Sequence, residues 1–321
     1  MAVPLIERFR DRLPVGPATP VISLGEGSTP LLRAERLGER LGVELWLKWE
    51  ASNPTGSYKD RGMTVAVSKA VEDGARAVIC ASTGNTSAAA AAYAARAGIP
   101  AVVLVTEGAA GGKLVQARAL GARVLTVRGS FDGALAAARE LADHGAYVLV
   151  NSLNPNRIAG QRTAVFEIVE ELGGAPDAFL IPYGGGGNTT AYAHALAELG
   201  LDVPLYSIES SDRPRTVASA IRIETPAHAD SVEASGAQVD AVTDHEIVDA
   251  WRDLAEVEGL FCEPSSAAGI AFLHRERSLR GRRVVVTITG HGLKDPETAG
   301  AHAPPPVVVD PDPDAIARAA E

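Results

Sequence analysis

The sequence predicts an α/β protein built from two open, twisted, parallel-sheet domains. Its 321 residues leave room for two domains at about 150 residues each. Short runs rich in β-branched residues alternate with Ala-rich helical stretches along most of the chain. This alternation is typical of parallel strands covered by helices on both faces. One sheet is too small for all of these strands, so we expect two domains with a cleft between them.

Seven segments have the composition of buried strands. They are 76–81, 101–106, 123–127, 147–150, 178–183, 203–209 and 283–289. Helices are expected to begin near Thr86, Leu114, Phe131, Ala159, Thr189, Asp244 and Pro264. Thr243 or Asp244, and Glu263 or Pro264, supply helix-start signals. The acidic, Pro-rich tail at 303–321 is expected to run as a strap over the surface and to end in a short helix.

Charge and cysteine content exclude several classes of protein. A net charge of −10 disfavours a surface for nucleic acid or another polyanion. Two cysteines, Cys80 and Cys262, exclude a disulfide framework and paired Cys-x-x-Cys zinc sites and suit a reducing cytoplasm. The histidines lack metal-ligand spacing, so no metal is expected. No membrane span or signal peptide is readable, and we expect a cytoplasmic protein that starts near Met1.

Lysine is rare in this chain, and one lysine stands in a distinctive segment. Only five of the 30 basic residues are lysines, which favours roles that Arg cannot take, such as a Schiff base. Lys59 follows an Asn-Pro-Thr-Gly turn at 53–56 and is expected in the first turn of a helix. The positive helix end would destabilise its ammonium form. The alternative is a solvated lysine beside Asp60.

Two strand-to-helix turns have the composition of anion-binding sites. The hydroxyls and exposed N–H groups of Ser-Thr-Gly-Asn-Thr-Ser at 82–87 suit a carboxylate, although an N-cap is an equal alternative. Four glycines at 184–187 let successive N–H groups converge on one phosphate. This loop is neither a Walker loop nor a dinucleotide fingerprint. It therefore indicates a small phosphorylated cofactor, with a flexible turn as the alternative.

The segment 287–296 follows the last predicted strand. A hydroxyl such as that of Thr289, at the end of a strand, could face the edge of a cofactor ring, because open α/β sheets bind ligands there. His291 lies between glycines and is more typical of a structural residue. This segment alone is a weak signal.

Taken together and in this order, the segments resemble pyridoxal-phosphate enzymes of the tryptophan-synthase-β fold, and within them the threonine synthase family. The likeness spans most of residues 20–300. Asp-Arg-Gly-Met at 60–63 and Gly-His-Gly-Leu-Lys-Asp-Pro at 290–296 are similar to threonine synthases specifically. The other matching segments are 25–31, 81–87, 151–158 and 160–161.

The resemblance implies a role for each matching residue. Lys59, preceded by Tyr58, would form the Schiff base with pyridoxal 5'-phosphate, Asn85 would meet the cofactor 3-hydroxyl, and Thr289 would bind the pyridine nitrogen. The cofactor phosphate would lie on Gly184, Gly185, Gly186, Gly187 and Asn188. The substrate carboxylate would lie on Ser82, Thr83 and Thr86. The substrate phosphate would meet Asn151, Ser152 and Arg157, with Lys113 as a further candidate.

The implied enzyme is a pyridoxal-phosphate-dependent lyase of threonine biosynthesis, commonly a homodimer. It would convert O-phospho-L-homoserine and water to L-threonine and phosphate. A large cofactor-phosphate-binding domain at 1–52 and 153–302 and a small substrate-binding domain at 53–152 are expected.

Three departures from the family pattern bear on specificity. Tyr58 replaces the usual Phe, the glycine loop lacks an additional Asn, and the loop at 106–113 is short. A β-replacement enzyme or a serine or threonine dehydratase with the same cofactor is the nearest alternative. A non-catalytic binding module is a second one. A nicotinamide enzyme is disfavoured because the dinucleotide fingerprint is missing.

Overall fold

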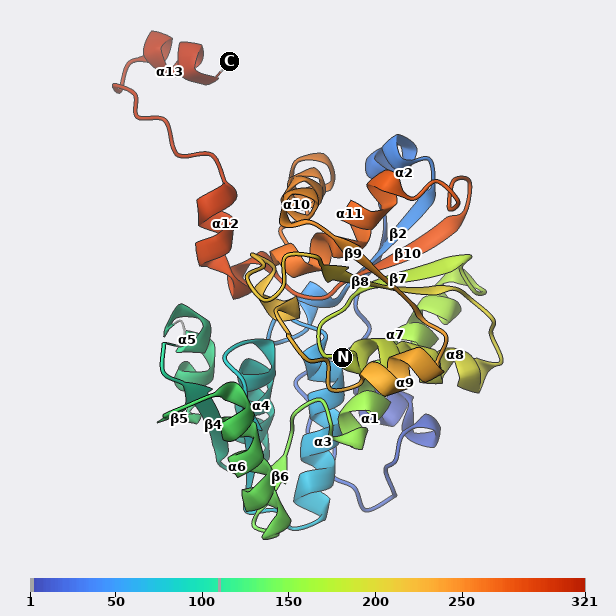
Figure 1. Cartoon of the computed structure of the whole chain (residues 1–321), viewed down its shortest axis with the longest axis vertical. Helices are drawn as coiled ribbons and strands as arrows, with labels where there is room; N and C mark the ends of the chain where they lie inside the picture. Colours follow the sequence, from blue (N-terminus) through green and yellow to red (C-terminus); the bar gives the residue numbers. More distant parts are fainter. Residues whose placement is uncertain (1–2, 109–110, 321) are drawn as a thin grey trace.

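Two separate β-sheets organise the chain (Figure 1). The computed structural model describes residues 3–108 and 111–320, so the expected start at Met1 lies outside the described residues. The six-stranded sheet has the order β1-β2-β10-β7-β8-β9, and the four-stranded sheet has the order β5-β4-β3-β6. Every strand pair is parallel except the antiparallel pair of β1 and β2. The prediction of two parallel-sheet α/β units is confirmed.

The large sheet takes its strands from both ends of the sequence. Its centre is β10 (Arg283–Ile288), in which Val286 pairs with Leu47 on one side and with Leu180 on the other. Sequence analysis missed three of its strands. In β2, charged residues interrupt the apolar run, and β1 and β9 lie at the sheet edges, with β9 mostly exposed. The remaining strands are β1 (Leu31–Arg33), β2 (Glu44–Trp49), β7 (Ala178–Pro182), β8 (Leu205–Ser210) and β9 (Gln238–Val242).

The small sheet has two buried central strands, β3 (Ala77–Ala81) and β4 (Ala101–Thr106). Its edge strands are β5 (Arg123–Val127) and β6 (Tyr147–Leu149). The prediction that 123–127 is a buried strand was wrong for burial, because an edge strand has a neighbour on one side only. Leu125 in β5 is 52% exposed. In the predicted strand 147–150, residues 147–149 are half-buried and Val150 is buried. Each sheet draws its strands from one of the two predicted domain ranges, and the domain boundaries themselves remain a proposal.

Helices connect the strands where the sequence predicts them. The predicted helix start at Asp244 is confirmed, and Thr243 forms a capping box with Glu246. No helix in the described residues is long and apolar enough to cross a membrane. The helices are α1 (Leu5–Arg8), α2 (Glu35–Leu41), α3 (Lys59–Glu72), α4 (Asn85–Ala97), α5 (Gly111–Ala119), α6 (Phe131–Asp143), α7 (Pro155–Leu172), α8 (Gly187–Leu199), α9 (Ala229–Ala234), α10 (Asp244–Glu258), α11 (Ala268–Arg275), α12 (Pro296–His302) and α13 (Pro313–Ala320), with 3-10 turns η1 (Arg10–Arg12), η2 (Glu50–Ser52), η3 (Ser219–Ile221), η4 (Pro264–Ala267) and η5 (Gly292–Lys294).

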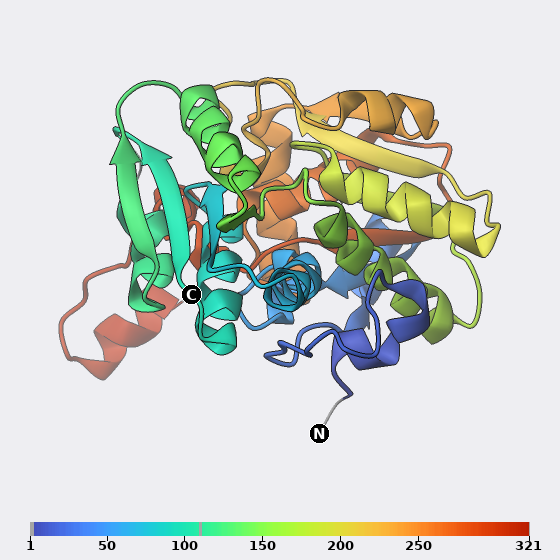
Figure 2. The same cartoon turned by 90° about the horizontal axis from the view of Figure 1, so that it is seen from below.

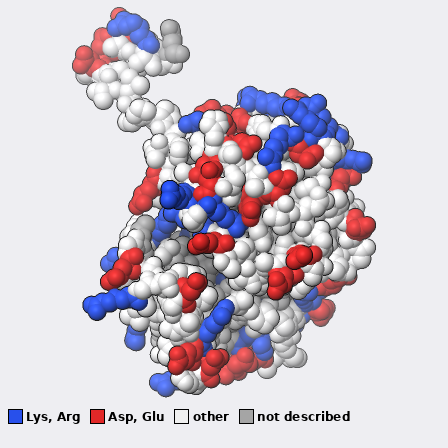
Figure 3. Space-filling view, in the orientation of Figure 1, with Lys and Arg blue, Asp and Glu red and all other residues white. Residues whose placement is uncertain are grey.

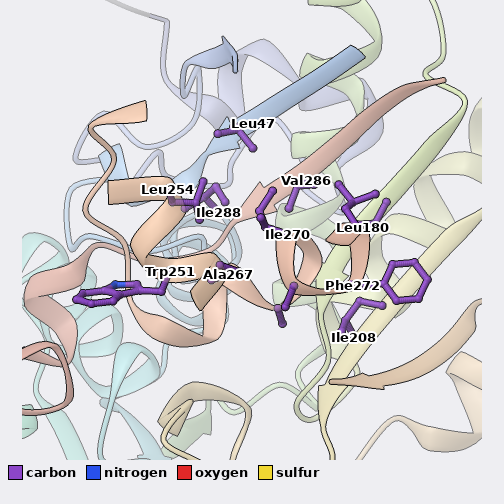
Figure 4. Packing of buried hydrophobic residues seen from close by; sticks show 14 of the residues in the cluster. Leu47, Leu180, Ile208, Trp251, Leu254, Ala267, Ile270, Phe272, Val286 and Ile288 are labelled. Atoms are coloured by element: carbon purple, nitrogen blue, oxygen red, sulfur yellow. The ribbon is translucent and has the colours of Figure 1, made fainter. Parts of the chain in front are cut away.

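The largest core lies on one face of the large sheet. Leu180 and Val286 from the strands pack with Ile270 of α11 and Leu254 of α10 (Figure 4). A second cluster, which includes residues of α7 and α8, covers the opposite face. Burial of this apolar surface, at roughly 25 cal/mol per Å², holds the sheet and its helices together. Cys80 and Cys262 are both buried small core residues, as predicted.

Helices α3 and α7 approach each other at two glycines. A Cβ atom on Gly62 would lie 2.6 Å from the Arg157 carbonyl oxygen, and one on Gly160 would lie 2.0 Å from the Arg61 carbonyl oxygen. Only glycine allows backbones to come this close. In the view from below, α3 is seen along its axis between the two sheets (Figure 2). This crossing therefore connects the two parts of the molecule.

The C-terminal tail does not form the predicted strap. The segment after α12 and helix α13 project away from the body (Figure 1), and Val308 is 94% exposed. No residue of α13 is buried. The Pro-rich composition explains the outcome, because repeated prolines favour extended backbone that lacks the donors for pairing.

On the face shown in Figure 3, acidic and basic side chains are interspersed.

We expect Gly160→Ala to lower the free energy of unfolding by roughly 2–3 kcal/mol, because the added methyl group forces α3 and α7 apart. Chemical denaturation measures this change. The matched control is Gly133→Ala in α6, where the nearest atom would be 3.5 Å away. The control should be neutral or slightly stabilising, since Ala is the better helix former. Equal stability of the two variants would contradict the proposed close contact.

Candidate active site

Lys59 is the first residue of α3, as the sequence predicts. The turn before it is attached to the end of β10: Ser57 forms a β-bridge with Gly290, and the Tyr58 amide donates to the Thr289 carbonyl at 3.0 Å. Within residues 3–108 and 111–320, no side chain caps this helix start. The lysine of one predicted segment and the threonine of another therefore meet at one place.

The surroundings of Lys59 favour a neutral amine. The side chain is half-buried, its Nζ hydrogen bonds with Tyr58 Oη, and Nζ lies 4.1 Å from the centre of the Tyr58 ring. Burial, assisted by the positive charge of Arg157 and opposed by Glu263, lowers the pKa of Lys59 to about 7. Burial raises the pKa of Tyr58 to about 12, so its phenol stays protonated. A neutral amine of this kind is a competent nucleophile and base.

A buried carboxylate, Glu263, joins two of the predicted segments. It accepts hydrogen bonds from Asn85 Nδ2 at 3.0 Å and from Thr289 Oγ1 at 3.3 Å. A Cβ on Gly290 would lie 2.6 Å from this carboxylate, so a side chain at that position would displace it. Burial raises the pKa of Glu263 above its usual range, while the Asn85 hydrogen bond works in the opposite direction. Asn85 and Thr289 thus face one acid from two different parts of the fold.

Sequence analysis missed the site position of Glu263 and treated it only as a helix-start residue. A weak signal was present: an acidic residue interrupts an otherwise apolar run after residue 260 and precedes small residues at 265–269. His228 was missed as well. Its Nε2 lies 3.1 Å from the Ser152 carbonyl oxygen, and its amide donates to the Gly185 carbonyl at 3.1 Å.

The glycine loop has the properties of a phosphate site. It connects β7 to α8, and Gly186 has a φ of +84° at the N-cap of α8, where glycine is favoured. Free N–H groups at this helix start point toward any bound anion. The Asn188 Nδ2 atom is buried and has no partner among the described residues, and a Cβ on Gly185 would meet open space. The phosphate of a cofactor therefore fits this loop.

Arg157 is a buried cation with unused donors. It lies in the first turn of α7 and is fully buried. Its Nη1 donates to the Val150 carbonyl at 3.0 Å, whereas Nε and Nη2 have no partner among the described residues. A buried guanidinium without a carboxylate is costly until an anion binds. This position suits the phosphate of a substrate, because guanidinium matches phosphate geometry.

The remaining predicted residues surround these groups. Ser82, Thr83 and Thr86 are half-buried at the start of α4. Asn151 exchanges hydrogen bonds with the backbone of Ala81, at 3.0 and 2.9 Å, so most of its amide is committed to holding the segment after β6 against the end of β3. Ser152 packs against Gly187 of the glycine loop.

Lys113 pairs with Asp295 at 2.9 Å. The loop at 106–113 that precedes it includes residues 109 and 110, which lie outside the described residues.

A surface hollow of about 720 Å³ lies elsewhere, between α8 with the segment that follows it and α9 with the segment that follows it. It contains none of the predicted site residues. The site is therefore assigned from side-chain chemistry at the ends of β3, β7 and β10 and not from the size of a hollow.

Comparisons with known proteins agree with this chemistry. Residues 22–290 match the family model described as "Pyridoxal-phosphate dependent enzyme". The chain is 48% identical to threonine synthase of Synechocystis sp., over 92% of this chain and 84% of that protein. It is 46% identical to threonine synthase of Halalkalibacterium halodurans, over 92% of this chain and 90% of that protein.

Among solved structures, maize serine racemase has the same fold. The TM-score is 0.79 at 20% identity, over 92% of this chain and 95% of that chain. At this identity the likeness shows the fold alone.

We expect the amine of Lys59 to become reactive with a midpoint near pH 7. Below that pH it is protonated and unreactive, and above it the free amine is available. Labelling of the cofactor-free protein with acetic anhydride across pH, read by peptide mass spectrometry, measures the midpoint. Lys69 on the same helix is the internal control, because its hydrogen bond to Glu72 raises its pKa above the usual value. If both lysines titrate together, the surroundings do not tune Lys59.

Proposed function

The chain belongs to the family of pyridoxal-phosphate dependent enzymes, and on this premise we propose that it catalyses the threonine synthase reaction. The substrate is O-phospho-L-homoserine, and the products are L-threonine and phosphate. Pyridoxal 5'-phosphate is the cofactor of this lyase. The observation that carries the substrate assignment is Arg157, a buried guanidinium with unused donors in the first turn of α7. The names of the relatives support the same reaction.

The residues of the site fit the cofactor. Its phosphate would be held by the loop from Gly184 to Asn188 at the start of α8, and its ring would be faced by Asn85 and Thr289. When bound, the cofactor withdraws electrons from the substrate α-carbon and so eases loss of the α-proton. Lys59 would anchor it, since its amine has a pKa of about 7.

Lys59 has the properties needed to move protons. The reaction removes protons from the α- and β-carbons, releases the γ-phosphate, and adds water at the β-carbon. A neutral amine accepts such protons and, once charged, returns protons to the α-carbon and to the γ-carbon, which becomes the methyl group of threonine. The phenol of Tyr58 hydrogen bonds with this amine and fixes its direction.

The substrate itself would be held at both ends. Ser82, Thr83 and Thr86 lie at the start of α4, where hydroxyls and N–H groups suit the substrate carboxylate. Arg157 and Ser152 would bind the phosphate. Because negative charge grows on the leaving phosphate as its bond to carbon breaks, a fixed guanidinium stabilises that transition state more than the bound substrate.

We further propose a cytoplasmic homodimer with a small substrate domain at 53–152 and a large domain at 1–52 and 153–302. The family resemblance supports the dimer. Two buried thiols support a reducing compartment. Sedimentation velocity of the purified protein tests the dimer, and a monomer at working concentration contradicts it.

Purified protein with its cofactor should release phosphate and threonine from O-phospho-L-homoserine in equal amounts. Lys59→Ala should abolish both, because the amine is removed, whereas Lys69→Ala on the same helix should retain them. Phosphate and amino-acid analysis measures the products. Absence of phosphate release would contradict the proposal, and keto acid formed from serine or threonine would indicate a dehydratase instead.

Arg157→Met should separate activity from stability. We expect kcat/KM for O-phospho-L-homoserine to fall at least about 100-fold, since a buried charge contact with phosphate is lost. The melting temperature should stay equal or rise, because the variant removes a buried charge that has no carboxylate partner. Arg162→Met on the same helix is the control, as Arg162 pairs with Glu198 near the surface. Retained activity of Arg157→Met would place the phosphate elsewhere.

A further inference from the structure

The Lys-Asp pair at 294–295 has no part in the chemistry described above, although it belongs to a segment similar to threonine synthases. It lies at the junction of η5 and α12, after the last strand of the large sheet. From there both side chains reach helix α5, which belongs to the small-sheet part of the fold. The segment from β10 to α12 approaches α5 in Figure 1.

Asp295 makes the first connection. Its carboxylate accepts hydrogen bonds from Lys113 Nζ at 2.9 Å, from Thr298 Oγ1 at 2.9 Å and from Ser219 Oγ. The Asp295 side chain is 2% exposed, and that of Lys113 is 18% exposed. Burial works to raise the pKa of Asp295, but hydrogen bonds from Ser219, Lys113 and Thr298 hold it below its usual range. The carboxylate is therefore charged and fixed from three sides.

Lys294 makes the second connection. Its Nζ donates to the Thr55 carbonyl at 3.0 Å and to Gln116 Oε1, and Gln116 Nε2 donates to the same Thr55 carbonyl at 3.2 Å. Thr55 lies in the turn that leads into Lys59, and its amide donates to Asp60. Helix α5 is thus tied to the turn that presents the reactive amine.

Two packing contacts bring the same segments together. A Cβ on Gly112 would lie 2.8 Å from the Glu297 carboxylate, so α5 and α12 are close at this point. A Cβ on Gly184 would lie 3.2 Å from the Ala220 carbonyl oxygen, and Ala220 follows the Ser219 that donates to Asp295. Asp295 is therefore connected to both α5 and the glycine loop.

We propose that Lys294 and Asp295 form a clasp that holds α5, and that Asp295 is a positioning residue that directs Lys113 to the phosphate of the substrate. This inference rests on the proposed function. An ammonium group has three N–H donors, of which Asp295 takes one and leaves two for phosphate oxygens. A free lysine side chain would lose rotamer entropy on binding phosphate. Because Asp295 already holds the Lys113 side chain in place, most of this entropy is lost on folding and not on binding.

The test uses the holoenzyme with Asp295→Asn, Lys113→Met and the double variant. Asp295→Asn should raise KM for O-phospho-L-homoserine and the inhibition constant of inorganic phosphate by about tenfold, as expected for loss of one charge-assisted contact. Its kcat and its affinity for L-threonine, which has no phosphate, should stay near those of the wild type. The double variant should be no worse than Lys113→Met, because both changes remove one interaction.

Glu72→Gln is the matched control, since it changes an acid to its amide in the surface pair with Lys69. If Asp295→Asn folds poorly, Ser219→Ala removes one donor to Asp295 without a change of charge and should shift the same constants in the same direction. Unchanged phosphate affinity, tighter phosphate binding, or additive effects in the double variant would each overturn the clasp. A wild-type enzyme that makes no threonine from O-phospho-L-homoserine overturns the proposed function instead, and phosphate binding by the variants still reports on the clasp.

Discussion

The backbone contact between α3 and α7 is the constraint on which the site depends. Gly62 and Gly160 let the two helices meet within one turn of Lys59 and Arg157. The Lys59 amine and the Arg157 guanidinium are thereby held near each other, and the guanidinium charge disfavours protonation of the amine. Behind them, Arg61 is bound by Glu50 at 2.7 Å and by Glu167 at 2.6 Å, and this buried network fixes the helix start. The fold therefore keeps the Lys59 amine and the Arg157 guanidinium close together although each disfavours a positive charge on the other.

Buried cations in the described part of the chain either have carboxylate partners or lack them, and this difference distinguishes structural residues from functional ones. Arg61 has carboxylate partners on both sides, whereas Arg157 has none among the described residues. A paired cation is a structural element, and an unpaired one needs an anion from outside the chain. In the same part of the chain, the lysines also divide into residues with carboxylate partners and residues without them. Lys48 is paired in the buried network with Glu167 at 3.1 Å, so the rarity of lysine indicates a special environment and not always catalysis.

The sequence was sufficient for features that depend on neighbouring residues and insufficient for those that depend on distant ones. The central strands β3, β4 and β7 read as continuous apolar runs because helices cover both sheet faces. In β2 the pattern is broken by Lys48, whose charge is neutralised by α7, far away in the sequence. The turn before Lys59 and the glycine loop were predictable as local motifs. Glu263 was not, because its significance comes from Asn85 and Thr289, 178 and 26 residues away.

Two of the contacts between the small-sheet part and the rest of the molecule differ in stiffness. At α3 and α7 the contact is backbone against backbone, and close-packed atoms of this kind do not slide without a large energy cost. At α5 the contact is made by the long side chains of Lys113, Gln116 and Lys294, whose torsions rotate in staggered steps of low cost. Side-chain rotation at α5 therefore costs less than displacement of the backbones at the glycine crossing. Separation of α5 from η5 and α12 would part Lys113 from Asp295, whereas the glycine crossing would keep Lys59 and Arg157 together.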